Sequence, residues 1–286
     1  MKDIPDKSVD MILCDLPYGN TECKWDNVID LKILWNQYKR IIKNTGIIAL
    51  TCTEPFNSFL LEDGKDIFKY DWIWMKSNCT GFLNAKVRPM RKHENILIFS
   101  KSPITSTSNK TIYNPQNLVP TKKIKKNFNT ESMGERKSRE NGSTYLQTMT
   151  NYPTTILEFD YDKDKFHPTQ KPVALFEYLI KTYTNEGDLV LDNCAGSGTT
   201  GVACKNLNRN FILIEKEEKY IKVIEERLGQ QSATGFTQNS TSSGFPTENS
   251  PNISLKDNSL ELSQISSNDE TSLNNNIKLM EAKTES

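Results

Sequence analysis

Four consecutive residues, Asp15-Leu16-Pro17-Tyr18, could bind and orient an amino group on a planar base. They follow the apolar run 9–14, so we expect them on a turn at the carboxyl end of a buried parallel strand, where open α/β sheets bind ligands. Pro17 biases Leu16 toward an extended backbone, which directs the Leu16 carbonyl out of the turn beside the Asp15 carboxylate. These two acceptors suit the hydrogens of an exocyclic amine, and the Tyr18 ring can stack on the heterocycle. An ordinary Pro-containing turn is the alternative, because Asp and Pro are common turn formers.

Residues 196–201 (GSGTTG) form a second candidate site. They follow an apolar run at 188–192 and precede a helical pattern, so they match G-x-G-x-x-G, and Glu215 closes the next predicted strand. A nicotinamide dinucleotide site, and hence an oxidoreductase, is one hypothesis for such a loop. That fold would need further strand–helix units after Glu215, where only about 15 residues with core-forming patterns remain. The partner strands must therefore come from the amino-terminal half.

A permuted sheet of this kind would bring the glycine loop and the Asp15 turn side by side at one edge. The loop amides and the start of the following helix favour a carboxylate, and two threonine hydroxyls add donors. An acid before the loop suits an ammonium group, and an acid after the next strand suits a ribose. S-adenosyl-L-methionine carries all three groups, so it is the cofactor that we predict. The cofactor residues read from this pattern are Asp192, Gly196, Gly198, Thr199, Thr200 and Glu215.

Alternating strands and helices would position both sites. Apolar or alternating runs predict strands at 9–14, 47–51, 70–75, 95–100, 188–192 and 211–215. Amphipathic patterns predict helices at 31–43, 56–61, 173–183, 199–207 and 217–228. We expect the first of these helices to end with a glycine cap at Gly46. This alternation favours an α/β fold with a doubly wound sheet.

The chain has no net charge, but its charges are unevenly distributed. Residues 76–150 carry 14 Lys and Arg against four acids, which indicates a region that faces a polyanion, with a solvated lysine-rich surface as the alternative. From about 101 to 165 the strand and helix patterns are lost and aromatic residues interleave with basic ones. This stretch fits either a nucleic-acid recognition insert or a disordered excursion. The nucleic-acid-binding candidates are Lys86, Arg88, Arg91, Lys92, Lys122, Lys123, Lys125 and Lys126.

Composition limits the class of protein further. No apolar run approaches 18 residues and no signal peptide opens the chain, so we expect a soluble cytoplasmic protein without a membrane partner. The six cysteines show no C-x-x-C pair, and only His93 and His167 could join them as metal ligands, so we expect reduced thiols and no metal site. Residues 231–286 hold 12 Ser and eight Asn, so 230–286 is predicted to be a disordered tail.

In their order along the chain, these motifs resemble the DNA amino-methyltransferases of the adenine-N6 and cytosine-N4 type. The likeness is to the permuted beta group, in which the catalytic motif precedes the cofactor loop, and it covers roughly residues 1–229. It rests on residues 15–18, 166–172 (FHPTQKP), 192–201 and Glu215. It implies a Rossmann-like, circularly permuted methyltransferase sheet with a catalytic half at 1–100, a target-recognition insert at 101–165 and a cofactor-binding half at 166–229. It also implies that Thr169 and Lys171 flank the methionine part of the cofactor.

The resemblance implies a reaction on duplex DNA. The target nucleotide is flipped out, and Asp15 with the Leu16 carbonyl holds its amino group for attack on the sulfonium methyl, with Pro17 and Tyr18 completing the catalytic motif. Adenine is favoured because cytosine-modifying relatives usually have Ser in place of Asp15. A cytosine-N4 enzyme and a DNA-binding relic without turnover are the alternatives. A homodimer and a cognate restriction endonuclease are left open as partners.

The chain departs from the family pattern in two places. Leu16 stands where Pro is most common, which should be tolerable because only its carbonyl is used. Relatives usually carry a further strand before the catalytic motif, ending in an acid near the cofactor adenine, and neither Asp3 nor Asp10 obviously replaces it. We therefore expect an upstream start, a weakened cofactor pocket or a partner that supplies the missing edge.

Overall fold

The computed structural model describes residues 1–19, 29–103, 110–126, 144–230 and 277–281. The centre of the predicted recognition insert, at 127–143, and most of the predicted tail, at 231–276 and 282–286, lie outside the described residues. None of the described helices is long and apolar enough to cross a membrane.

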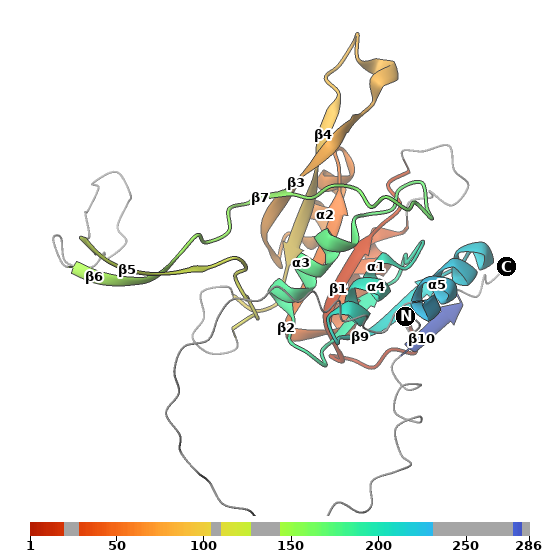
Figure 1. Cartoon of the computed structure of the whole chain (residues 1–286). Helices are drawn as coiled ribbons and strands as arrows, with labels where there is room; N and C mark the ends of the chain where they lie inside the picture. The colour runs from red at the N-terminus through yellow and green to blue at the C-terminus, as the bar shows by residue number, and fades with distance from the viewer. Residues whose placement is uncertain (20–28, 104–109, 127–143, 231–276, 282–286) are drawn as a thin grey trace, which may run out of the picture.

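An eight-stranded sheet forms the centre of the described chain (Figure 1). Its strands, in spatial order, are β10 (Ile277–Glu281), β9 (Asn210–Glu215), β8 (Leu189–Asp192), β1 (Val9–Asp15), β2 (Ile42–Cys52), β4 (Arg91–Phe99), β3 (Phe68–Thr80) and β7 (Ile156–Glu158). The first strand of the chain, β1, is parallel to both of its neighbours, β2 and β8. The strand after residue 188 therefore returns beside the first one, which confirms the predicted permuted sheet.

Helices cover both faces of the sheet, as a doubly wound fold requires. On one face lie α1 (Leu31–Ile41) and α2 (Phe56–Gly64), and on the other lie α3 (Val173–Tyr183), α4 (Thr199–Asn206) and α5 (Glu218–Gln230). Met11 and Leu13 of β1 join the core on the α3 face, whereas Ile12 and Cys14 join the core on the α1 face. Because both faces of β1 are buried, residues 11–14 form a continuous apolar run. The run ends where the strand reaches the edge of the sheet, at Asp15.

The predicted glycine cap at Gly46 is wrong. Helix α1 ends at Ile41, the chain passes directly into β2, and Gly46 lies within that strand. A Cβ atom on Gly46 would lie 2.8 Å from the carbonyl oxygen of Asp10, so this glycine allows the β1 backbone to approach closely. The contact falls where the β1–β2 register shifts. The glycine therefore marks a strand irregularity, and not the end of a helix.

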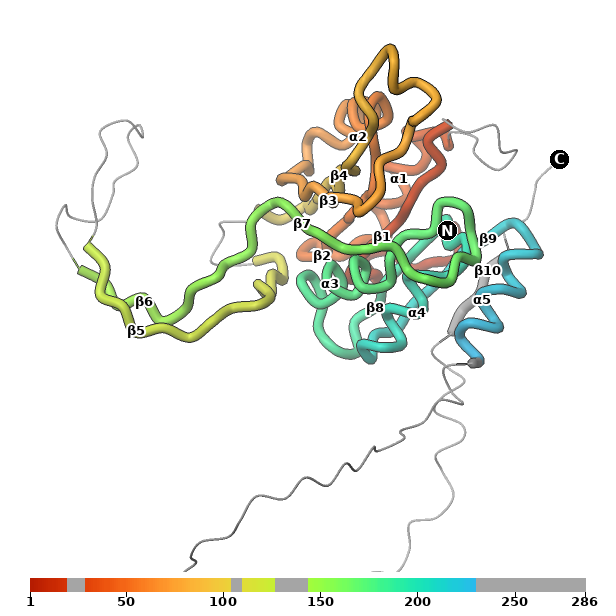
Figure 2. The backbone as a smooth tube through the Cα atoms, turned by 45° about the horizontal axis from the view of Figure 1, so that its top comes forward, coloured from red at the N-terminus to blue at the C-terminus, as the bar shows by residue number. Residues whose placement is uncertain are grey.

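Two segments extend away from the sheet (Figure 2). Strands β5 (Val119–Lys126) and β6 (Thr144–Thr150) form a separate antiparallel ribbon within the predicted insert. Strands β3 and β4 continue beyond the sheet as a long hairpin, with the short helix η1 (Phe82–Asn84) at its tip. Strand β7 also falls within 101–165, but it extends the central sheet beside β3. The part of the predicted insert that leaves the sheet is therefore shorter than the sequence indicates.

Strand β10 comes from the segment predicted to be disordered. Its five residues lie parallel to β9 at the edge of the sheet, with Ile277 opposite Phe211 and Glu281 opposite Glu215. An edge strand offers unpaired backbone groups that a further strand can satisfy. The short sequence IKLME contains residues that can form such a strand. Sequence analysis missed it because the composition around it is rich in Ser and Asn.

Candidate active site

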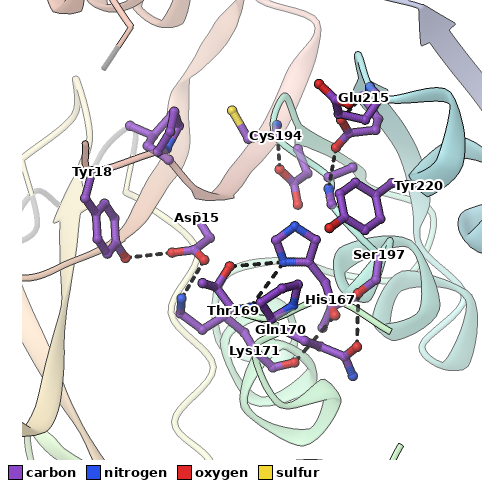
Figure 3. A pocket seen from close by; sticks show the side chains of 18 of the residues that line it. Asp15, Tyr18, His167, Thr169, Gln170, Lys171, Cys194, Ser197, Glu215 and Tyr220 are labelled. Carbon is purple, nitrogen blue, oxygen red and sulfur yellow. Dashed lines mark hydrogen bonds and ion pairs between the residues drawn. The ribbon is translucent and has the colours of Figure 1, made fainter. Parts of the chain in front are cut away.

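A cavity of about 570 Å³ lies at the carboxyl edge of the sheet, across the ends of β1, β8 and β9 (Figure 3). Residues 15–18 line one part of it, and Gly196 and Glu215 line another. The turn near the start of the chain and the glycine loop near residue 200 therefore share one cleft, as the sequence predicts. Its volume is typical of small-molecule and cofactor sites, which span roughly 300–1,000 Å³.

The glycine loop owes its shape to two residues with positive φ. Gly196 has φ +52° and Gly198 has φ +78°, in the left-handed region that favours glycine. The N–H of Gly196 donates to Oε2 of Glu215 over 2.8 Å, so the acid at the end of β9 holds the loop in place. A Cβ atom on Gly198 would lie 2.9 Å from Ile224 of α5, which shows how closely this helix packs beneath the loop.

This packing predicts a cost for any side chain at position 198. We expect Gly198→Ala to lower the free energy of unfolding by about 1–3 kcal/mol, because alanine is strained at this φ and its methyl group would overlap Ile224. Urea unfolding measures the effect. Gly229→Ala is the matched control, since a Cβ atom there meets nothing within 4 Å, and it should be neutral or stabilising. Equal stability of the two variants would contradict the loop geometry.

Asp192 lies beneath the loop and is only 3% exposed. Its Oδ1 accepts the N–H of Cys194 over 3.0 Å, and its Oδ2 accepts the hydroxyl of Thr200 over 2.5 Å. Burial raises the pKa of Asp192 to about 6, although these two hydrogen bonds oppose the rise. The residue predicted to bind an ammonium group thus also organises the loop, and its buried charge favours a cationic partner in the cavity.

The raised pKa of Asp192 predicts a pH dependence of stability. Its ordinary value is 3.8, so between about pH 4 and 6 the folded state holds the proton more often than the unfolded state does. The free energy of unfolding should therefore fall by up to about 3 kcal/mol as the pH rises through this window. Asp192→Asn removes this contribution. Urea unfolding at pH 4 and pH 7 measures the free energy of unfolding of both proteins. The variant should become more stable relative to the wild type at pH 7 than at pH 4. The same difference in stability at both pH values would contradict the raised pKa of Asp192.

The cavity wall includes some of the predicted cofactor residues and leaves out others. Gly196 and Thr199 line it, but Gly198 and Thr200 do not. The Thr200 hydroxyl is bound to Asp192, and the Thr199 hydroxyl lies 3.5 Å from the Lys171 carbonyl oxygen. Gly198 and Thr200 therefore stabilise the conformation of the loop and do not line the cavity.

Residues 167–171 line the cavity between its two parts (Figure 3). The His167 ring lies 4.4 Å from the Tyr220 ring, centroid to centroid, and its Nδ1 is 3.1 Å from the Thr169 hydroxyl. Burial lowers the pKa of His167, which favours the neutral ring. Sequence reasoning singled out Thr169 but missed His167 and Tyr220 as wall residues. The position of His167 two residues before Thr169 was the available signal.

Lys171 contacts Asp15 of the predicted catalytic motif, although the sequence assigns Lys171 to the cofactor. Its Nζ lies 2.5 Å from Oδ2 of Asp15 and 3.4 Å from Oε2 of Glu94. Burial by itself lowers the pKa of Lys171, but these two carboxylates outweigh it and raise the pKa above its ordinary value. Glu94 also lies 3.3 Å from the buried ammonium of Lys76. The result is a row of alternating charges, Asp15, Lys171, Glu94 and Lys76, in which the two lysines are buried and the two acids partly buried. The sequence singles out only the first two members.

The Asp15 carboxylate retains room for one more donor. Its Oδ1 accepts the hydroxyl of Tyr18 over 2.6 Å and also that of Thr51, and its Oδ2 accepts Lys171. A carboxylate has about four acceptor positions, so one position on Oδ2 is available to an incoming amine. The Tyr18 ring packs 5.3 Å from the Phe56 ring and lines the cavity. Leu16 turns its side chain into the α1-face core at 3% exposure, which supports the view that only its backbone serves the site.

The predicted nucleic-acid-binding residues fall into two separate groups. Lys86, Arg88, Arg91 and Lys92 belong to the β3–β4 hairpin. Lys122, Lys123, Lys125 and Lys126 belong to the β5–β6 ribbon, and none of them lines the cavity. The hairpin is attached next to the cavity, because its residues Asn78 and Thr80 are part of the wall. Arg91 donates to the Thr53 hydroxyl over 2.9 Å, which ties the hairpin to the end of β2.

The chemistry of the cavity fits S-adenosyl-L-methionine. A buried acid with a raised pKa can receive the ammonium group, and the start of α4 at Thr199 can receive the carboxylate. Glu215 accepts three backbone N–H groups, which leaves about one acceptor position for a ribose hydroxyl. Within the described ranges, no three His, Cys, Asp or Glu side chains are grouped as ligands for a metal ion.

The fold and the cavity together define a methyltransferase of the Rossmann-like class. Residues 9–226 match the family model of DNA methylases of the N6-adenine and N4-cytosine type, and the chain belongs to this S-adenosyl-methionine-dependent family. The family, fold class and cofactor predicted from the sequence are thus confirmed.

Individual relatives agree with this assignment. The type II methyltransferase M.HpaI of Haemophilus parainfluenzae is 29% identical over 255 residues, which make up 81% of this chain and 71% of the relative. The crystal structure of the M1.HpyAVI–SAM complex is 28% identical with a TM-score of 0.52, over 77% of this chain and 89% of that one. PvuII DNA methyltransferase, described as cytosine-N4-specific, is 16% identical with a TM-score of 0.54, over 84% of each chain, and shows likeness of fold alone.

Proposed function

We propose that this protein is a site-specific DNA methyltransferase that methylates the exocyclic amino group of adenine in duplex DNA. The observation that carries the proposal is the shared cavity, because it brings the amine-binding turn at Asp15 and the cofactor loop at Gly196 to the same space. A direct transfer between two bound groups needs both of these subsites within one cleft.

The residues of the cavity suggest how the transfer proceeds. The target nucleotide turns out of the duplex at a cost of about a few kcal/mol, and Tyr18 provides an aromatic wall for the base. Asp15 and the Leu16 carbonyl accept the two amino hydrogens, which turns the nitrogen lone pair toward the methyl group. A bound cofactor would supply that methyl group from its sulfonium and leave as a neutral thioether, and the methylated nitrogen would release its proton to solvent. Lys171, Tyr18 and Thr51 fix the carboxylate, so positioning and electrostatics carry the rate.

Methyl transfer from radiolabelled S-adenosyl-L-methionine to unmethylated bacterial DNA tests the proposal. After digestion to nucleosides, we expect the label in N6-methyldeoxyadenosine, because Asp15 opens the catalytic motif. Label in N4-methyldeoxycytidine would move the target to cytosine. Binding of the cofactor and of DNA without any transfer would refute the enzyme and favour a DNA-binding relic.

We assign target recognition to residues 101–165, which include the β5–β6 ribbon. Its four lysines on β5 are exposed and suit the phosphate backbone. Changing Lys122, Lys123, Lys125 and Lys126 to Gln should reduce the slope of log affinity against log salt by about 3–4, since each phosphate contact contributes about 0.9. Filter binding at several salt concentrations measures the slope. The same change at the exposed Lys2, Lys7, Lys32 and Lys65 is the control, and an equal reduction there would contradict a specific role for the ribbon.

A further inference from the structure

The tip of the β3–β4 hairpin exposes large apolar side chains. Leu83 is 97% exposed, Val87 is 82% exposed and Phe82 is 79% exposed. The hairpin that carries them stands clear of the sheet at the top of Figure 1. Their exposure shows that no part of the described chain covers them. Apolar groups gathered in this way on a soluble domain usually mark an interaction surface.

The tip is held in one shape by its own backbone. Gly81 adopts φ +90°, and its carbonyl oxygen accepts the N–H of Asn84 over 3.0 Å. The Asn84 carbonyl in turn accepts the N–H groups of Val87 and Arg88, each over 3.0 Å. The turn is therefore closed by internal hydrogen bonds, and its apolar side chains are presented on a preformed support.

Charge and position indicate what the tip contacts. Residues 80–93 contain the cations Lys86, Arg88, Arg91 and Lys92 and no acid, so a polyanion is the complementary partner. At the other end of the hairpin, Asn78 and Thr80 line the cavity that holds the catalytic turn. The same hairpin thus carries an apolar tip, a basic flank and part of the cavity wall.

We propose that residues 81–90 form a wedge that enters duplex DNA beside the target base and holds open the space that the base leaves. This inference rests on the proposed function and deepens it. Apolar side chains inserted between base pairs unstack them, and the cost is offset by the wider contact that the opened duplex allows. The exposed cations Lys86, Arg88 and Lys92 would hold the phosphates on either side, while the extruded base lies in the cavity next to the hairpin.

The double variant Phe82→Ser/Leu83→Ser tests the wedge. Both side chains are exposed, so the fold should survive, and Ile33→Ser/Phe59→Ser is a matched control, because these residues are 62% and 51% exposed on α1 and α2. Sequencing of DNA methylated by the wild type first supplies the target site. Two duplexes with that site are then compared, one fully paired and one with an abasic position opposite the target base, which makes extrusion easier.

We expect the wedge variant to methylate the paired duplex about 10-fold or more slowly than the wild type, and the abasic duplex within about threefold of it. A 2-aminopurine probe at the target position should lose its fluorescence increase in this variant only. Wild-type rates on the paired duplex, or an equal loss on both duplexes, would overturn the wedge. So would binding to phosphatidylserine vesicles that the variant abolishes while methylation is unchanged, since the tip would then serve a membrane. Failure of the wild type to methylate any DNA would instead reject the proposed function.

Discussion

Replacement of Asp15 by Ala is expected to lower the rate of methyl transfer about 10²–10³-fold, the usual effect of removing one preorganised electrostatic contact at a reacting group. In the proposed mechanism the Asp15 carboxylate accepts a hydrogen of the amine, and Tyr18, Thr51 and Lys171 all orient this carboxylate. Alanine leaves these three donors without their acceptor and the amine without its anchor. Transfer from radiolabelled cofactor to unmethylated DNA under single-turnover conditions measures the loss.

The binding of cofactor distinguishes a catalytic role of Asp15 from a structural one. Calorimetry should give a dissociation constant for S-adenosyl-L-methionine within about threefold of the wild type, because Asp192, Gly196 and Glu215 are held by hydrogen bonds that do not involve Asp15. Asp3→Ala removes an exposed acid near the start of the chain and should leave the rate unchanged. Full activity in the Asp15→Ala protein would remove the proposed mechanism.

The second large effect concerns Lys171. Lys171→Met should lower the free energy of unfolding by about 3–5 kcal/mol, because removal of one partner from a buried ion pair leaves uncompensated charge. Asp15 and Glu94 would then face each other without the ammonium that lies between them. Urea unfolding measures the change. Lys181→Met, on the exposed side of α3, is the control and should stay within about 0.5 kcal/mol of the wild type.

A double variant separates charge balance from positioning. Lys171→Met/Glu94→Gln removes one charge of each sign, so we expect it to regain part of the lost stability. Methyl transfer should nevertheless stay low, because the Asp15 carboxylate still lacks the cation that orients it. Recovery of both stability and transfer would show that Lys171 serves only the fold.

The parts of the site that are contiguous in sequence could be predicted from it. The run 9–14 ends in Asp15, and the run 188–192 leads into the glycine loop, so each motif carries its own strand. Their meeting follows from topology, because parallel strands bring their carboxyl ends to one edge. Sequence signals of this kind are local, and they are strongest where a strand is buried on both faces.

Contacts between distant segments could not be predicted in this way. Lys171 and Asp15 are 156 positions apart, and the neighbours of Lys171 point to the cofactor and not to the carboxylate. Glu94 and Lys76 read as ordinary charged residues of strands, because only the packed structure shows that they are buried beside the site. The hairpin tip was missed for a related reason: apolar residues in a sequence indicate burial, whereas Phe82 and Leu83 are exposed.

The central place of β1 has a consequence for how the protein is made. This strand leaves the ribosome well before β8, with which it pairs through Val190 and Leu191, so one side of β1 stays without its partner until residues 189–192 have been synthesised. Such distant pairing slows folding and leaves an open strand edge in the nascent protein. A nascent chain that ends before residue 188 would contain the turn at Asp15 but would lack the glycine loop that we assign to the methyl donor. In the proposed function, activity can begin only after residues 188–215, which carry the glycine loop and Glu215, have been synthesised.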